Sequence, residues 1–158
     1  MKLEKLSAIA EIISSLAILV TLIFLAVQTS QNTRAVAEQT AITRFSVYES
    51  NVTSINDWRS SLIQTPELLE LWIRLQNAPE SGLTPREQTL GNFLFAHLAS
   101  IFENAFVAYQ LGVLKPAGWE FFRTRTCDTY ELFQDSLWPN AAGFLNIQFV
   151  EYVENNCG

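Results

Sequence analysis

Residues 6–27 have the sequence LSAIAEIISSLAILVTLIFLAV, and Glu11 is their only charged side chain. A helix needs about 20 apolar residues, each rising about 1.5 Å, to cross the hydrocarbon layer of a bilayer. A helix also satisfies its own backbone hydrogen bonds, and this stretch contains no Pro or Gly to interrupt it. We therefore expect an unbroken transmembrane helix in a single-pass membrane protein, in contact with membrane lipid.

A cleavable signal peptide is the competing interpretation of this N-terminus. Lys2 and Lys5 precede the apolar stretch, and Ala35, Val36 and Ala37 resemble a small-x-small cleavage site. However, the apolar stretch is longer than a usual signal-peptide core, and a polar segment ending in a charge separates it from the candidate cleavage site. These features favour retention as a membrane anchor.

The orientation of the span is predicted from the Lys and Arg residues that flank it. Lys2 and Lys5 lie on one side, and Arg34 and Arg44 lie on the other. Because the lysines are closer to the membrane, we expect a cytoplasmic N-terminus and an extracytoplasmic C-terminal domain.

Small side chains recur along one face of the expected span. Spacings of three and four residues form a stripe that contains Ser7, Ala10, Ser14, Ala17 and Thr21. Small residues allow membrane helices to pack closely, so we expect the stripe to contact a second copy or another membrane protein. The alternative is that such residues simply occur in membrane helices. Glu11, beside the stripe, would contact the partner helix or extend to the headgroups near Lys5.

Residues 28–62 continue the helical pattern beyond the span without Pro or Gly. Their apolar residues recur at nearly heptad spacing, which is typical of a helix with one packed face. This seam contains Ala41, Phe45, Tyr48, Val52, Ile55, Trp58 and Leu62. We expect a helical stalk that packs along the seam on the domain or on another copy.

Residues 63–158 are expected to form a compact helical domain. Two segments, TPE at 65–67 and TPRE at 84–87, are typical helix starts. Each places a threonine hydroxyl at the N-cap, a proline at the first helical position and a glutamate in the first turn. Residues 85–111 are apolar almost all round, which predicts the buried central helix, and Gly112 would end it. Two further helices broken near Pro139 complete an all-α fold with a transmembrane helix at 1–27, a stalk at 28–62 and a bundle at 63–158.

Composition excludes several classes of function. The net charge is -6, and the 10 basic residues form no cluster, which argues against nucleic acid as a partner. The single histidine, His97, precludes a multi-histidine metal site, and its place on the predicted core helix suggests a buried, hydrogen-bonded residue. No catalytic triad or cofactor motif is present, so we expect no enzyme, no cofactor and no metal.

The pairing state of two cysteines depends on the side of the membrane on which the domain lies. Cys127 and Cys157 fit no zinc, haem or redox spacing. They could pair as a disulfide if the domain is extracytoplasmic, and they would be free thiols if it is cytoplasmic.

Glu103 lies in the most apolar predicted helix, where an unpaired carboxylate would be costly. Arg123 and Arg125 on the next helix are the natural partners, and we expect a buried ion pair between Glu103 and Arg123. The alternative is a carboxylate at the base of an aromatic ligand pocket.

Five motifs extend over most of the chain: EKLSAIAE at 4–11, QTSQNTRAV at 28–36, TPELLELW at 65–72, GLTPREQ at 82–88 and FENAFVAYQLGVL at 102–114, followed by Trp119. In these motifs the chain resembles an uncharacterised family of bacterial single-pass membrane proteins. The resemblance implies an all-helical protein with no assigned activity, so it transfers no functional residue. Members of the family often carry more arginines after the span, which would imply a cytoplasmic domain.

The sequence therefore predicts a membrane-anchored scaffold or accessory subunit that acts through protein contacts, as a homo-oligomer or within a membrane-protein complex. The alternative is a membrane-tethered sensor that binds a small apolar ligand. Its pocket would lie among four aromatic residues of the domain: Phe102, Phe106, Trp119 and Phe122.

Overall fold

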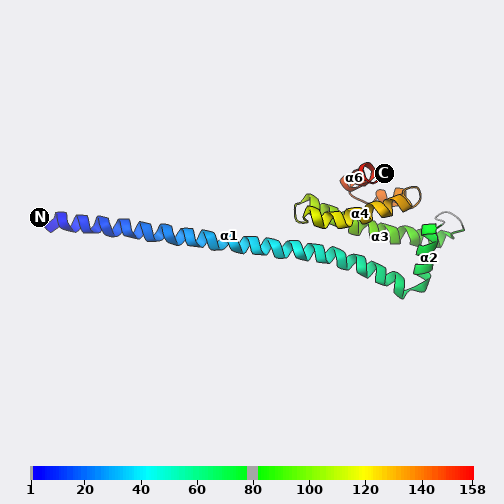
Figure 1. Ribbon diagram of the computed structural model, residues 1–158, viewed down its shortest axis with the longest axis horizontal. Coiled ribbons are helices and arrows are strands. Elements are labelled where there is room, and N and C mark those ends of the chain that lie inside the picture. The colour runs from blue at the N-terminus through cyan, green and yellow to red at the C-terminus, as the bar shows by residue number, and fades with distance from the viewer. Residues whose placement is uncertain (1, 78–81) are drawn as a thin grey trace. The chain divides into compact units, whose positions relative to one another are not determined.

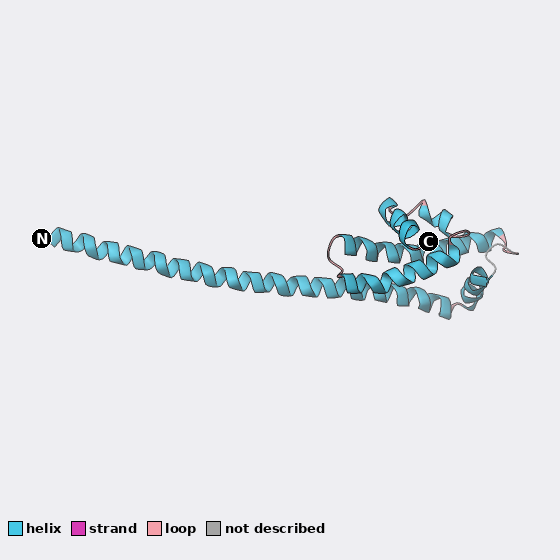
Figure 2. Ribbon diagram, turned by 45° about the horizontal axis from the view of Figure 1, so that its top comes forward, coloured by secondary structure: helices cyan, strands magenta, loops and turns pink. Residues whose placement is uncertain are grey.

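The computed structural model describes the backbone of residues 2–77 and 82–158, and within these ranges the side chains of residue 11 and of residues from 13 onward. Every regular element in this part of the chain is a helix (Figure 2). In chain order the helices are α1 (Lys2–Gln64), α2 (Pro66–Asn77), α3 (Pro85–Gln110), α4 (Pro116–Phe133), α5 (Trp138–Ala142) and α6 (Ile147–Asn156) (Figure 1). The prediction of an all-α fold is confirmed.

The chain divides into two units, Met1–Ile42 and Thr43–Gly158, and the second is the compact unit. The division falls within the predicted stalk, so residues 28–62 do not form a unit of their own. The seam explains why: Ile55, Trp58 and Leu62 are buried in the core of the compact unit, whereas Phe45 is exposed. The last part of α1 is therefore a core helix of the bundle.

Helix starts follow the local signals in the sequence. Pro66, Pro85 and Pro116 begin α2, α3 and α4, where a missing backbone N–H removes no helical hydrogen bond. At α3 the predicted capping box is confirmed, because Thr84 Oγ1 accepts from the backbone N–H of Glu87 and Glu87 Oε2 accepts from the backbone N–H of Thr84. This backbone hydrogen bond, and a further one from the Arg74 guanidinium of α2, lower the pKa of Glu87 to about 2.

Gly112 ends α3, as predicted. Its φ of 68° is in the left-handed region, which glycine adopts without steric cost. The turn directs the backbone N–H groups of Val113 and Leu114 to the carbonyl oxygen of Ala108, each at 2.9 Å. The carbonyl oxygen of Ala108, in the last turn of α3, is thereby satisfied before the chain reverses into α4.

Aromatic rings form a continuous chain through the compact unit. The ring centroids of Trp58 (α1) and Trp72 (α2) are 4.9 Å apart, and those of Trp72 and Phe133 (α4) are 5.2 Å apart. Further centroid distances of 5.2 to 6.5 Å join Phe133 in turn to Phe95, Trp138, Phe149, Phe106 and Trp119. Such pairs add about 0.5–1.5 kcal/mol each beyond the burial of their area. One aromatic core thus connects all the helices of this unit.

Two details of the predicted bundle are wrong. Three helices follow Gly112 instead of two. The expected break near Pro139 is present, between Phe133 and Trp138, but Pro139 itself lies in the first turn of a short additional helix, α5. Helix α3 is not buried all round: Phe95 and Phe102 are in the core, but Leu90 and Phe93 are exposed. The described helices cover only one side of α3, so its outer face keeps apolar side chains in contact with solvent.

Candidate functional site

Residues 13–27 of α1, the apolar segment, expose apolar side chains on all sides. Ten of them are 49–62% exposed: Ile13, Leu16, Ile18, Leu19, Val20, Leu22, Ile23, Phe24, Leu25 and Val27. By length and composition this part of α1 could cross a membrane, and none of its most apolar window is buried. Helix α3 passes the same test, but 44% of its window is buried, as in the core helix of a compact domain.

Hydroxyl groups on the apolar segment bond to the backbone of their own helix. Ser15 Oγ donates to the carbonyl oxygen of Glu11 at 2.8 Å, and Thr21 Oγ1 donates to that of Ala17 at 2.8 Å. Thr29, just beyond the segment, repeats the contact with Leu25 at 2.9 Å. These hydroxyls can therefore lie in apolar surroundings without a further donor or acceptor.

The predicted helix-packing stripe is only partly described. Glu11, Ser14, Ala17 and Thr21 are all exposed. Ser7 and Ala10 lie within α1, but their side chains fall outside the described residues. The part of the stripe that the structure describes is therefore accessible to another helix.

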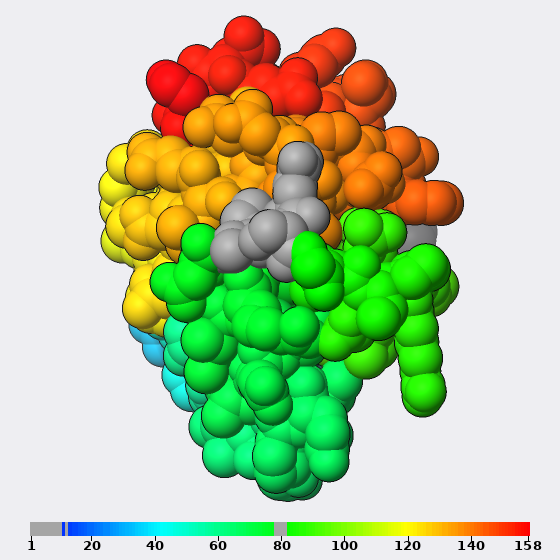
Figure 3. All heavy atoms as spheres, turned by 90° about the vertical axis from the view of Figure 1, so that its right-hand side faces the viewer, coloured from blue at the N-terminus to red at the C-terminus, as the bar shows by residue number. Residues whose placement is uncertain are grey.

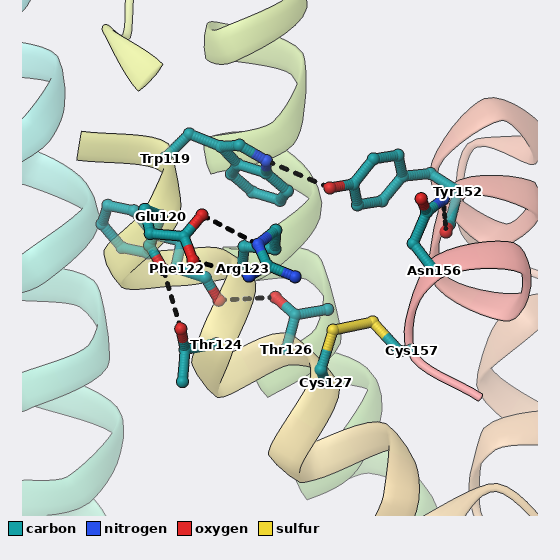
Figure 4. Close-up of a disulfide and its surroundings, with 10 residues drawn as sticks. All are labelled: Trp119, Glu120, Phe122, Arg123, Thr124, Thr126, Cys127, Tyr152, Asn156 and Cys157. Atoms are coloured by element: carbon teal, nitrogen blue, oxygen red, sulfur yellow. Dashed lines mark hydrogen bonds and ion pairs between the residues drawn. A yellow bond between two sulfur atoms is a disulfide. The ribbon is translucent and has the colours of Figure 1, made fainter. Parts of the chain in front are cut away.

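A disulfide joins Cys127 of α4 to Cys157, the residue after α6 (Figure 4). The two Cα atoms are 4.8 Å apart, although the residues are separated by 30 positions in the sequence. Of the two states that the sequence left open, the structure contains the paired one. The bond holds the C-terminal end of the chain against α4.

The predicted buried ion pair between Glu103 and Arg123 is wrong. Arg123 donates two hydrogen bonds to Glu120, one turn earlier on the surface of α4, at 2.6 and 2.8 Å (Figure 4). This contact lowers the pKa of Glu120. Glu103 instead accepts a hydrogen bond from the backbone N–H of Asn146 at 2.5 Å. Glu103 is half-buried at the edge of the core, so its carboxylate needs no buried cation.

His97 is exposed on the outer face of α3, so the prediction that it is buried is wrong. The residues that the structure describes contain no group of three or more His, Cys, Asp or Glu side chains arranged to hold a metal ion.

The four aromatic residues predicted to line a ligand pocket are core residues. Phe102, Phe106, Trp119 and Phe122 are all buried. The rings of Phe106 and Trp119 lie 5.6 Å apart, and the indole N–H of Trp119 donates to the Tyr152 hydroxyl at 3.4 Å (Figure 4). Side chains of the protein itself fill this region.

Two hollows lie elsewhere, beside α3 near α5. The apolar hollow has a volume of about 410 Å³ and is lined by Thr89, Asn92, Phe93, Ala96, Asn140, Ala141 and Phe144. The polar hollow has a volume of about 370 Å³ and is lined by Leu75, Leu83, Gln88, Asn92, Ser136, Leu137 and Asn140. Figure 3 shows the end of the compact unit where green atoms from α2 and the start of α3 meet orange atoms from the chain around α5.

Asn92 and Asn140, the amide pair, belong to both hollows. Asn140 Nδ2 donates to Asn92 Oδ1 at 3.3 Å. Within the described chain, the Asn92 amide N–H groups and the Asn140 carbonyl oxygen make no other hydrogen bond, and the buried Ser136 hydroxyl has no partner. None of the described lining residues is ionisable. This arrangement can bind an uncharged molecule.

Sequence reasoning missed these hollows because an asparagine on a helix usually indicates a solvated face. One signal was available: Asn92 is the only polar side chain among residues 90–96 of the sequence. In comparisons with known proteins, no family model, curated protein or solved structure matches this chain.

Proposed function

We propose that the chain is a single-pass membrane protein that displays its compact unit as a scaffold or accessory subunit, acting through protein contacts instead of catalysis. The observation that carries this proposal is the apolar segment, which is exposed on all sides and in which the hydroxyls of Ser15 and Thr21 bond to the backbone of their own helix. Exposing apolar surface to water costs about 25 cal/mol per Å², whereas a bilayer removes this cost.

The disulfide supports an orientation with the compact unit on the extracytoplasmic side. Disulfides form and persist in oxidising compartments and are rare in the cytoplasm. The bond between Cys127 and Cys157 is therefore consistent with a cytoplasmic N-terminus in a bacterial inner membrane. It also supports the orientation predicted from the flanking lysines over the one implied by the family resemblance.

Cysteine labelling in intact cells tests this proposal. Ser60→Cys places a new thiol on an exposed part of α1 within the compact unit, and Lys2→Cys places one before the apolar segment. With a membrane-impermeant maleimide, we expect Ser60→Cys to react in intact cells and Lys2→Cys to react only after permeabilisation. The reverse pattern would overturn the orientation, and equal labelling in intact cells would overturn the single span.

We propose that these protein contacts form by association of the apolar segment with another membrane-spanning helix. It is supported by the stripe, whose described members Ser14, Ala17 and Thr21 are exposed. Ser14→Leu with Ala17→Leu should reduce the size of the assembly in mild detergent, measured by light scattering. Leu16→Ala with Leu19→Ala, at other exposed positions of the segment, is the control. A double leucine variant of unchanged size would exclude this route.

A second candidate function is a membrane-tethered sensor for a small apolar ligand. The apolar hollow favours it, at a position different from the one the sequence suggested.

A further inference from the structure

We infer that the apolar hollow binds an uncharged molecule with a flat apolar body and an amide or carbonyl group, which hydrogen-bonds to the amide pair. This inference rests on the sensor function and names its ligand class. It does not depend on the membrane anchor, because every lining residue that the structure describes belongs to the compact unit.

The size of the hollow suits a small molecule. Its volume of about 410 Å³ lies within the range of roughly 300–1,000 Å³ that is typical of ligand pockets. Ala96 and Ala141, two of its lining residues, are small, which leaves this space open.

The absence of charged side chains from the described lining selects against ionic ligands. Asp, Glu, Lys and Arg make up 16% of the chain, yet none of them is among the described residues of either hollow. An ionic ligand would lose hydration without gaining a counter-charge. An anion would in addition meet a chain with a net charge of -6.

Two aromatic side chains suit a flat apolar body. Phe93 and Phe144 line the apolar hollow while remaining 69% and 87% exposed. Neither makes a ring contact like those that hold the core aromatics together. A flat ring between them would gain the offset or edge-to-face contacts that aromatic pairs prefer, and it would cover surface that water now contacts.

The amide pair supplies the polar recognition. After the 3.3 Å hydrogen bond between the two side chains, Asn92 still has amide N–H donors and Asn140 still has a carbonyl acceptor. A ligand carbonyl can accept from Asn92, and a ligand N–H can donate to Asn140. A site built in this way discriminates against analogues that cannot make both bonds, because its own polar groups would then lose their water without replacement.

Three matched probes test the inference: 2-naphthamide, naphthalene and 2-naphthoate. Binding to the full chain in mild detergent is measured by equilibrium dialysis, and Ala96→Phe, which fills the hollow, provides the background for partition into micelles. We expect 2-naphthamide to bind about tenfold more tightly than naphthalene, as one to two net hydrogen bonds imply. We expect 2-naphthoate to bind more weakly than either.

Two asparagine variants test the role of the amide pair. Asn140→Ala should reduce the affinity for 2-naphthamide to that for naphthalene, whereas Asn104→Ala, an exposed asparagine of α3 outside both hollows, should leave the preference intact. Unchanged tryptophan fluorescence would show that each variant is folded. If Asn140→Ala is destabilised, Phe144→Ser, which changes an exposed side chain, should still weaken the binding of all three probes.

Three results would overturn the inference: no binding above the Ala96→Phe background, binding of 2-naphthoate as tight as that of 2-naphthamide, or an unchanged preference in Asn140→Ala. None of these results bears on the membrane anchor, which cysteine labelling tests separately.

Discussion

The disulfide between Cys127 and Cys157 should contribute a large share of the stability of the compact unit. It closes a loop with a sequence separation of 30. In the chain-entropy model, such a crosslink lowers the entropy of the unfolded chain by about 12 cal/mol/K, or about 3.6 kcal/mol at 25 °C. For a urea dependence of about 1–3 kcal/mol/M, its loss should lower the midpoint of unfolding by roughly 1–4 M.

Urea unfolding of the full chain in mild detergent measures this loss. All four tryptophans lie in the compact unit and are buried there, so their fluorescence reports on the unfolding of that unit alone. Cys127→Ser, Cys157→Ser and the double variant should lose the same stability, since each removes the same bond. Reduction of the native chain should have a matching effect. If the double variant loses the sum of the two single losses, or if reduction changes nothing, the reasoning is refuted.

Three further predictions concern the compact unit. Leu62→Ala should lower the free energy of unfolding by about 2–5 kcal/mol, because the Leu62 side chain is only 4% exposed. Ile63→Ala should change it by less than about 0.5 kcal/mol, because the Ile63 side chain is 70% exposed. Equal effects in urea unfolding would contradict the assignment of this part of α1 to the core. The pKa of Glu87 is lowered from 4.5 to about 2, so its stabilising contribution is complete above pH 4.5 and is lost as the pH falls toward 2. Unfolding midpoints measured from pH 7 to pH 2 should therefore decrease more steeply for the native chain than for Glu87→Gln, and parallel curves would count against this. Glu103→Ala should lower the free energy of unfolding by about 1 kcal/mol through its lost hydrogen bond, and Arg123→Ala, on the surface of α4, should have a smaller effect. Equal losses that do not add in the double variant would instead indicate an ion pair between the two residues.

Features encoded by neighbouring residues were predictable from the sequence. The proline at the start of α3, its capping box and the left-handed glycine at its end each depend on a few adjacent positions. The seam was also correct in its second half, because Ile55, Trp58 and Leu62 repeat at helical spacing and are buried.

Features that depend on contacts between different helices were not predictable from the sequence. Glu103 was expected to need Arg123, but the turn before α6 supplies a backbone N–H closer to it, and Glu120 is adjacent to Arg123 on the same helix. The apolar hollow needs a residue of α3 next to one of α5, and helical periodicity says nothing about such pairs. The pairing of the cysteines likewise became evident only when α6 was seen against α4.

We expect the apolar segment to anchor the chain in a membrane. Alkaline carbonate extraction of cell membranes, followed by intact-mass measurement, tests this anchoring. The native chain should remain in the membrane pellet at its full mass. Leu16→Arg with Leu19→Arg should release it, since each charge near the centre of a span costs about 2.5–3.5 kcal/mol. Val36→Arg with Ile42→Arg, at exposed positions of α1 beyond the segment, should remain in the pellet. Release of the native chain into the supernatant, or a mass that corresponds to cleavage after Ala37, would show that this segment does not anchor the mature chain.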